Sequence, residues 1–495
     1  MAAIGMTPEA VWGGLRQDWC VGLGNGKREV ESQYWRESRE GGEAWFELVV
    51  SRREQLETYA SKQDGGSAAG LIVLVADAEP MEFLAGFWAG ILAGWTVALG
   101  NPNWATSDWQ STYQLINPNI IWGNSPPSPV TERSRSPIPL SPSILIPTSG
   151  TSGQPKFTRH TWTTLTAAVS GFCRHFQPDN TPVNTYCVLP LYHVSGLMQA
   201  LRTWLTNGQI SILPFKNLLS PPYPFPLLPP HTYLSLVPTQ LSRLLTARKA
   251  PWLKQFHAIL LGGAPPWPAL LDQAARHQIP ICLSYGMTET GAMVAAMRSQ
   301  DFSQGHRSRN LSSGRPMPHA KIQIEDRGKR LPSGKIGQIV VTSSAIAHGY
   351  YNAPSPSFEG RAFYTDDLGY LDDLGQLHVT GRASDKIISG GENIFPTEVE
   401  AALRSSSQVL NVCVVGLPDA DWGEVVAAAY IPAYRVVSAD SLRAALDEGG
   451  QLSRYKYPKR WFPLENLPEN AQGKVNRLAL RALLDQLSSQ SGGYQ

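Results

Sequence analysis

A short stretch dense in hydroxyl groups and glycines is the part of this sequence whose residue types point most directly to chemistry. Residues 147–156 read P-T-S-G-T-S-G-Q-P-K. Gly150 and Gly153 permit positive φ and close backbone approach, so successive N–H groups can converge on an anion. Side-chain donors to the same anion belong to Thr148, Ser149, Thr151, Ser152 and Lys156. The stretch therefore predicts a loop that binds the oxygens of a polyphosphate.

Two other interpretations of this stretch are weaker. A Walker loop requires Gly-Lys followed by Ser or Thr, whereas Gln154 and Pro155 separate Gly153 from Lys156. A polar surface turn without a ligand would account for the composition alone, and only the family resemblance given below disfavours it.

Regular elements on both sides must position the loop. Residues 143–146 (S-I-L-I) are typical of a short buried strand, and residues 161–177 carry apolar side chains at helical spacing. We therefore expect the loop to join a strand directly to a helix. Two more apolar runs, 258–261 and 281–283, enter loops in the same way, and in open α/β sheets such junctions gather at one edge, where ligands bind.

The loop sequence resembles the phosphate loop of the adenylate-forming superfamily, which includes acyl- and aryl-CoA ligases, luciferases and peptide-synthetase adenylation domains. The resemblance implies an α/β fold: a large N-terminal adenylation domain, built of distorted sheets plus a β subdomain, and a small mobile α+β C-terminal domain. It implies a reaction in two halves. A carboxylate attacks the α-phosphate of ATP to give acyl-AMP and pyrophosphate, and the thiolate of CoA then attacks the acyl carbonyl, so ATP, Mg²⁺ and coenzyme A are expected.

A second motif, Y-G-M-T-E-T-G at 285–291, supports the same resemblance. The Tyr285 ring offers a stacking face for adenine, the Thr288 hydroxyl can reach the α-phosphate, and Glu289 can hold Mg²⁺. A polar turn after a buried strand would explain the glycines but not the Tyr, Thr and Glu in this order. Close backbone approach to the nucleotide is expected at Gly262, Gly263 and Gly286.

The stretch Y-T-D-D-L-G at 364–369 resembles the T-G-D element of the family, whose carboxylate takes both ribose hydroxyls. Asp367 is the matching carboxylate, and Asp366 stands where the family has glycine. Arg382, in the segment G-R-A-S-D-K, matches an arginine that contacts the ribose and phosphate.

Two positions beyond Arg382, Ser384 matches the hinge about which the small domain turns, where many relatives carry Asp or Lys. The resemblance thus divides the chain into an N-terminal ATP- and acyl-binding domain, 1–383, and a mobile C-terminal domain, 384–495. Gly391 is implied to line the channel for the pantetheine arm of CoA. The segment 470–477, N-A-Q-G-K-V-N-R, resembles the closing motif, which makes Lys474 the adenylation lysine. By itself, a lysine in a glycine loop would be taken for solvated surface.

The acyl pocket is the least determined part of the site. A histidine after a strand, such as His193 in P-L-Y-H-V-S-G, is more often a satisfied turn or core residue, but the resemblance implies that it borders and gates the acyl pocket, with Ser195 beside it. We therefore count His193, Thr288, Glu289 and Lys474 as catalytic candidates. Arg202, on the helix expected after His193, is our candidate for binding a second carboxylate, with a surface position as the equal alternative.

The strings L-P-L-Y-H-V-S-G-L and I-I-S-G-G-E-N-I-F-P resemble most the branch that joins o-succinylbenzoate to CoA in menaquinone or phylloquinone synthesis. The expected substrate is thus a small aromatic dicarboxylate. Other aryl- or fatty-acyl-CoA ligases and a carrier-protein loading enzyme are alternatives. A catalytically inactive scaffold is disfavoured, because Glu289, Arg382 and Lys474 are all present.

The composition of the chain limits its number of domains and the kinds of partner that it can have. The 495 residues, 42% of them hydrophobic, predict two or more domains. With 17% charged residues and a net charge of +2, nucleic acid is not indicated as a partner. We expect no export signal, because residues 1–6 lack a basic region and an apolar region. We expect no membrane span, because acidic residues break the longest apolar stretch, 70–100.

The five cysteines are scattered without metal-ligand spacing, which favours free thiols and a cytoplasmic protein. The oligomeric state stays open, with a homo-oligomer as one alternative.

Overall fold

The computed structural model describes residues 6–15, 37–63, 68–123, 141–149, 155–177, 179–219, 228–303, 312–434, 437–450, 452–469 and 475–490. Five of the expected site residues lie outside these ranges: Gly150, Thr151, Ser152, Gly153 and Lys474.

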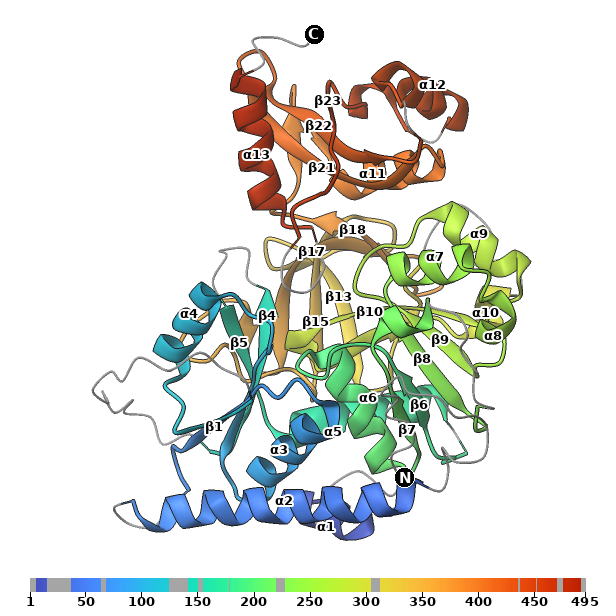
Figure 1. Cartoon of the computed structure of the whole chain (residues 1–495). Coiled ribbons are helices and arrows are strands. Elements are labelled where there is room, and N and C mark those ends of the chain that lie inside the picture. The colour runs from blue at the N-terminus through green and yellow to red at the C-terminus, as the bar shows by residue number, and fades with distance from the viewer. Residues whose placement is uncertain are drawn as a thin grey trace.

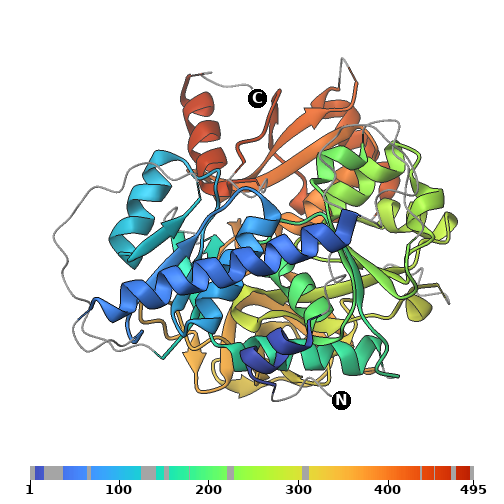
Figure 2. The ribbon, with the colours of Figure 1, turned by 60° about the horizontal axis from the view of Figure 1, so that its bottom comes forward.

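The first sheet has five strands in the order β3-β1-β2-β4-β5. Its strands are β1 (Ile72–Val75), β2 (Thr96–Leu99), β3 (Ile120–Trp122), β4 (Ile144–Ser149) and β5 (Pro155–His160). Strands β3, β1, β2 and β4 run parallel, and β5 is antiparallel to β4. The helices of this part are α1 (Pro8–Gly14), α2 (Glu37–Ser61), α3 (Pro80–Leu92) and α4 (Thr106–Ile116). The long helix α2 lies across the outside of the large domain and packs on α3 (Figure 2).

The second sheet has seven strands in the order β12-β11-β10-β9-β8-β6-β7. They are β6 (Asn184–Cys187), β7 (Ile210–Ile212), β8 (Thr232–Leu236), β9 (Ala258–Leu261), β10 (Ile281–Met287), β11 (Ala292–Ala296) and β12 (Arg315–Pro316). Alternate side chains of β8 face opposite cores, with Leu234 and Leu236 in one and Tyr233 in the other. Helices α5 (Trp162–Phe176) and α6 (Val194–Leu205) lie on the Tyr233 side, and α7 (Pro238–Thr246), α8 (Ala250–Leu253) and α9 (Pro268–Arg276) on the other.

The third sheet is antiparallel and forms the β subdomain that the family resemblance implied. It contains β13 (Ala320–Asp326), β14 (Lys329–Arg330), β15 (Gly337–Ser343), β16 (Phe358–Glu359), β17 (Ala362–Leu371) and β18 (Leu377–Arg382). The short elements nearby are α10 (Ser299–Ser303) and the 3-10 turns η1 (Phe215–Leu218) and η2 (Thr288–Thr290).

A smaller domain follows β18 and stands on the β17–β18 end of the large domain (Figure 1). Its sheet holds β19 (Ile387–Ser389), β20 (Glu392–Ile394), β21 (Val409–Asp419), β22 (Gly423–Pro432) and β23 (Arg460–Pro463). Its helices are α11 (Pro396–Ser405), α12 (Ala439–Gly449), α13 (Arg477–Gln490) and the turn η3 (Arg454–Lys456). The mixed α/β fold with a large N-terminal and a small C-terminal domain is therefore confirmed. Among the helices within the described residues, none combines the length and the apolar character needed to cross a bilayer.

One expectation about the glycine-rich loop was wrong: it joins two strands, not a strand and a helix. Residues 155–160 form β5, which pairs with β4 from Ile144 opposite His160 to Ser149 opposite Pro155. Phe157 is buried in the core, and the Thr158 hydroxyl donates to the carbonyl of Ile146 at 3.1 Å, so pairing outweighs the helical pattern that starts just beyond. Helix α5 begins only at Trp162, capped by Thr161.

Candidate functional site

Asp367, in the middle of β17, is held by residues of two other strands. The Tyr285 hydroxyl, from β10, donates to Asp367 Oδ2 at 2.7 Å. Arg382 Nε, from β18, lies 3.4 Å from Asp367 Oδ1, and the two residues are register partners between β17 and β18. Burial raises the pKa of Asp367, while the Tyr285 hydrogen bond and the Arg382 charge oppose that rise. The structure thus brings together the three residues expected to surround the nucleoside.

Three glycines, Gly262, Gly263 and Gly286, leave the backbone without side chains at the ends of β9 and β10. A Cβ on Gly286 would lie 1.9 Å from the carbonyl oxygen of Ala292, so only glycine fits where β10 bulges against β11. Gly263 has a φ of +78°, in the left-handed region, and a Cβ on Gly262 would lie 2.8 Å from the Ser284 hydroxyl. A flat ligand could approach this backbone closely.

Thr288 and Glu289 lie in η2, directly after β10, and a buried histidine fixes this turn. His160 Nε2 hydrogen bonds to the Thr288 carbonyl at 2.8 Å, and Nδ1 to the Thr164 hydroxyl at 3.0 Å. Burial lowers the pKa of His160 to about 4, so the ring is neutral. Because a carbonyl only accepts, Nε2 carries the proton. His160 therefore ties β5 and α5 to the turn that presents Thr288, a role that the sequence analysis missed.

Glu289 is 8% exposed and has one well-defined partner. The Tyr350 hydroxyl donates to Glu289 Oε1 at 2.8 Å, and burial raises the pKa of the carboxyl. Lys156 Nζ lies 5.8 Å from the centre of the Tyr350 ring, and Thr148 stands opposite Lys156 across the β4–β5 hairpin. The phosphate-loop strands and the expected metal ligand thus meet at Tyr350, which sequence reasoning had not singled out.

The donor set fits Mg²⁺ held together with a nucleotide. The described residues contain no group of three His, Cys, Asp or Glu that could hold a metal by themselves. Mg²⁺ is usually bound by one or two carboxylates plus phosphate oxygens and water, and Glu289 supplies such a carboxylate beside the phosphate-loop strands.

The three residues expected in the acyl region, His193, Ser195 and Arg202, lie on or next to α6 but differ in their exposure to solvent. His193 is the N-cap residue of α6, and Ser195 in its first turn is exposed. Arg202, at the other end, is only 5% exposed, so a surface position is excluded. Its guanidinium lies 4.2 Å from the centre of the Phe172 ring.

Arg202 is a buried cation without an anion. Its Nε is buried with no hydrogen-bond partner, and across the described ranges the guanidinium makes no ion pair. Burial lowers its pKa to about 10, which reflects the cost of keeping the charge there. A carboxylate arriving from outside would offset this cost.

His319 lies close enough to Arg202 to be affected by its charge. Burial lowers the pKa of His319 to about 4, and the charges of Arg174 and Arg202 add to this effect. A Cβ on Gly171, in the middle of α5, would lie 1.7 Å from His319 Nδ1. The helix therefore uses glycine where the ring needs room. A glycine inside an otherwise helical pattern was the signal that could have drawn attention to this place.

At the boundary of the small domain, Ser384 is exposed and its hydroxyl donates to Asp366 Oδ2. Gly391 lies in the turn between β19 and β20 with a φ of +85°, and no atom lies within 4 Å of a Cβ built on it. Among the described residues, a Cβ added at residue 391 would thus have open space around it in this arrangement.

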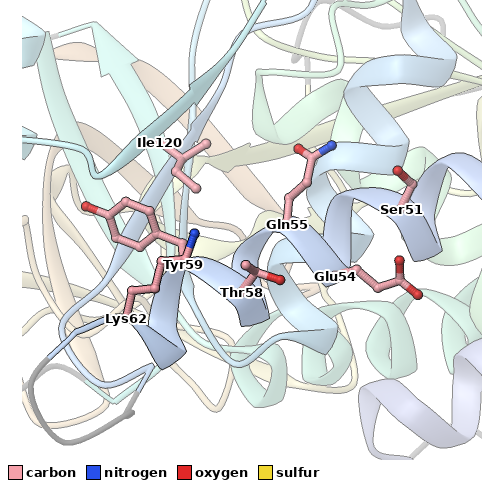
Figure 3. A pocket seen from close by; sticks show the side chains of 7 residues that line it. All are labelled: Ser51, Glu54, Gln55, Thr58, Tyr59, Lys62 and Ile120. Atoms are coloured by element: carbon pink, nitrogen blue, oxygen red, sulfur yellow. The ribbon is translucent and has the colours of Figure 1, made fainter.

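A shallow depression of about 460 Å³ lies away from all these residues, along α2. Figure 3 shows the side chains that line it: Ser51, Glu54, Gln55, Thr58, Tyr59, Lys62 and Ile120. It contains none of the expected site residues.

Two family models match the chain: the AMP-binding enzyme over residues 74–351 and the AMP-binding enzyme C-terminal domain over residues 398–474. The 2-succinylbenzoate–CoA ligase of Bacillus velezensis is 36% identical over 343 residues, which are 68% of this chain and 68% of that protein.

The fold matches the o-succinylbenzoate CoA synthetase of Bacillus subtilis in complex with its acyl-adenylate intermediate, with a TM-score of 0.74 at 26% identity, covering 89% of this chain and 93% of that one. The complex of the same enzyme with ATP and magnesium also gives 0.74 at 26% identity, over 89% of this chain and 94% of that one. A double mutant bound to a CoA product analogue gives only 0.60, at the same 26% identity and with coverage of 89% and 93%.

Proposed function

Because the chain belongs to the AMP-binding enzyme family, we propose that it is an AMP-forming acid–CoA ligase that acts on 2-succinylbenzoate. It converts 2-succinylbenzoate, ATP and CoA into 2-succinylbenzoyl-CoA, AMP and pyrophosphate, a step of menaquinone or phylloquinone synthesis. The relatives in Bacillus velezensis and Bacillus subtilis, which carry this activity in their names, support the assignment.

The observation that carries the substrate assignment is the unpaired charge of Arg202. A dicarboxylate keeps one carboxylate after the other has been activated, and that anion needs a partner inside the pocket. Arg202 is buried, cationic and without an ion pair in the described part of the chain. A fatty or simple benzoic acid would leave this charge unpaired at a large cost in free energy, so the dianion is the better fit.

Each part of the nucleotide is assigned its own set of residues. Asp367 and Arg382 take the ribose, Tyr285 and the bare backbone of Gly262, Gly263 and Gly286 take the adenine, and Thr148, Lys156 and the rest of the glycine-rich loop take the phosphates. When bound, Mg²⁺ held by Glu289 neutralises phosphate charge.

In the first half-reaction a carboxylate oxygen of the substrate forms a bond to the α-phosphorus, and the bond to the pyrophosphate oxygen breaks. Negative charge grows on the α-phosphate oxygens, so the Thr288 hydroxyl and the Lys474 ammonium stabilise the transition state by donating to them. In the second half-reaction the CoA thiolate displaces AMP from the acyl carbon, while His193 and Ser195 border the acyl group.

The two half-reactions need two placements of the small domain. We assign residues 1–383 to the large domain and 384–495 to the mobile one, with Ser384 as the hinge. The higher TM-score to the adenylate and ATP complexes than to the CoA product analogue complex supports an adenylate-forming arrangement here. The four described cysteines are free, which supports a cytoplasmic location.

A carboxylate panel tests this function. Purified protein with ATP, Mg²⁺ and CoA is offered 2-succinylbenzoate, benzoate, succinate and octanoate, and CoA ester and AMP are measured. We expect rapid turnover with 2-succinylbenzoate alone. Preference for a monoacid would reject the substrate but keep the ligase, and adenylate without CoA ester would favour carrier-protein loading.

A further inference from the structure

The two positions where this chain departs from its family pattern near the hinge touch each other. Asp366 replaces the glycine of the T-G-D element, and Ser384 stands where many relatives carry Asp or Lys. The Ser384 hydroxyl donates to Asp366 Oδ2, and the backbone N–H of Ala383 donates to the Asp366 carbonyl at 2.8 Å. The residue at the pivot is thus tied to the large domain by a side chain that the family pattern lacks.

The charged residues on the two sides of Ser384 form ion pairs with different domains. Before it, Arg382 pairs with Asp367 of the large domain at 3.4 Å. After it, Asp385 lies 3.4 Å from Arg477 of α13, which also pairs with Glu400 of α11 at 2.7 Å. Ser384 is therefore the residue at which a rotation of the small domain would be absorbed.

Several other contacts across the domain boundary lie away from the pivot. The Thr397 hydroxyl donates to the Thr380 carbonyl at 2.8 Å, and α11 packs against β18 and α9, where Arg404 lies 5.9 Å from the centre of the Trp267 ring. Only the bond to Asp366 acts on the side chain of Ser384 within the described residues.

We propose that Asp366 is a positioning residue that holds Ser384, and with it the small domain, in the adenylate-forming arrangement until the domain turns. The proposal rests on the two-step function proposed above. A change of φ and ψ at residue 384 carries the hydroxyl away from Asp366, so the bond exists in one arrangement and not in the other. An interaction present in one state only shifts the equilibrium between the states by its own strength.

The test uses Asp366→Gly, which restores the family residue, and Ser384→Ala. Both groups are exposed, so the expected shift is moderate, about three- to tenfold. Each variant should lose that factor in pyrophosphate exchange and keep or gain rate in thioester formation from supplied acyl-AMP. Their combination should lose no more than either alone. The KM for ATP should not change, because Asp367 and Arg382 remain.

Two conservative variants separate positioning from a general effect of charge. The Asp366 charge also raises the pKa of neighbouring Asp367, so its loss has an electrostatic effect of its own. Asp366→Asn removes the charge but keeps an acceptor, and Ser384→Thr keeps the hydroxyl, so both should behave like the unchanged enzyme. If Asp366→Asn behaves like Asp366→Gly, the effect is electrostatic and the proposal is overturned. Asp373→Asn, an exposed carboxylate in the β17–β18 turn, is the matched control.

A measurement without substrate keeps this proposal separate from the assigned activity. Trypsin can cut after Arg382 and Lys386, on either side of the pivot. The free Asp366→Gly and Ser384→Ala proteins should be cut several-fold faster there than the unchanged protein and the Asp366→Asn variant. Equal cutting rates would overturn the positioning role, whatever acid the enzyme uses. Faster cutting in a protein that makes no CoA ester would support the positioning role and reject the ligase function instead.

Discussion

At the scale of single residues, Arg202 shows how a binding group can weaken the free protein. A buried cation without a partner costs folding free energy, and the lowering of its pKa to about 10 reflects that cost. Such a residue is expected where a ligand supplies the missing charge.

Replacing Arg202 by Met should therefore have two opposite effects. The KM for 2-succinylbenzoate should rise roughly tenfold to a hundredfold, since a charge-assisted hydrogen bond to a buried group is worth about 1.5–3 kcal/mol. The Tm of the free enzyme should rise, because a buried unpaired charge is replaced by an apolar side chain of similar length. Steady-state kinetics and thermal unfolding check the two effects separately.

Arg52 is the matched control, because it is a half-buried arginine that has a partner. Its Nη1 lies 2.9 Å from Asp77 Oδ2. Arg52→Met should lower the Tm by stranding the Asp77 carboxylate, and it should leave the KM unchanged. A fall in Tm on changing Arg202, with no change in KM, would mean that Arg202 is a structural residue and no substrate anchor.

At the scale of elements, His160 joins β5, α5 and η2, and its burial makes that junction sensitive to acid. Burial holds the pKa of His160 at about 4 against an ordinary 6.5. Between these values the unfolded chain binds more protons than the folded one, so stability is fully present above the ordinary pKa and is lost as pH falls toward the lower one.

The Tm should accordingly fall as pH is lowered from about 7 to about 5, and His160→Gln should flatten part of this slope. Glutamine can still donate to the Thr288 carbonyl but does not titrate. His277→Gln, at the exposed end of α9, is the matched control. An unchanged slope in His160→Gln would assign the acid sensitivity to other buried groups, such as His319.

The β19–β20 turn gives a second prediction at this scale. Gly391→Leu should leave pyrophosphate exchange nearly intact, because a side chain at residue 391 meets no atom within 4 Å of its Cβ in this arrangement. Thioester formation should fall strongly, since the side chain would fill the proposed pantetheine channel once the small domain has turned. The readout is each half-reaction by itself.

Gly375→Leu controls for backbone strain in that experiment. Gly375 has a φ of +72°, close to the +85° of Gly391, and it too has no atom within 4 Å of a Cβ, but it lies in the β17–β18 turn. Equal loss of thioester formation in both variants would place the CoA channel elsewhere.

At the scale of the whole molecule, we propose that one site serves two reactions because a small domain can present different residues to it. Lys474 belongs to the small domain by its motif and is proposed to serve adenylate formation alone. Lys474→Ala should reduce pyrophosphate exchange about 10²- to 10³-fold, the usual effect of losing one donor to developing charge, about 2.7–4 kcal/mol. Thioester formation from supplied acyl-AMP should remain.

Lys335→Ala removes an exposed lysine from the large domain and should change neither half-reaction. A similar loss of both half-reactions in Lys474→Ala would instead indicate that this lysine has a general structural role.

The sequence predicted features that depend on neighbours along the chain. The strands that enter 262–263 and 285–291 were confirmed, because apolar periodicity is local. Local reasoning was wrong at 155–160, where pairing with β4 makes a strand of residues that were expected to lead straight into a helix.

What only the tertiary structure decided are contacts between residues far apart in the sequence. The Tyr350 hydroxyl reaches Glu289 across 61 positions, and Tyr285 reaches Asp367 across 82. Asp366 and Ser384 looked like two unrelated departures until the β17–β18 hairpin brought them together. That Arg202 is buried and has no ion pair in the described part of the chain depends on which side of α6 faces Phe172 and the sheet. The sequence by itself determined which chemical groups are present and in which order. Packing decided which of them meet, because burial and pairing depend on how sheets and helices stack, and periodicity along one element does not specify its partner.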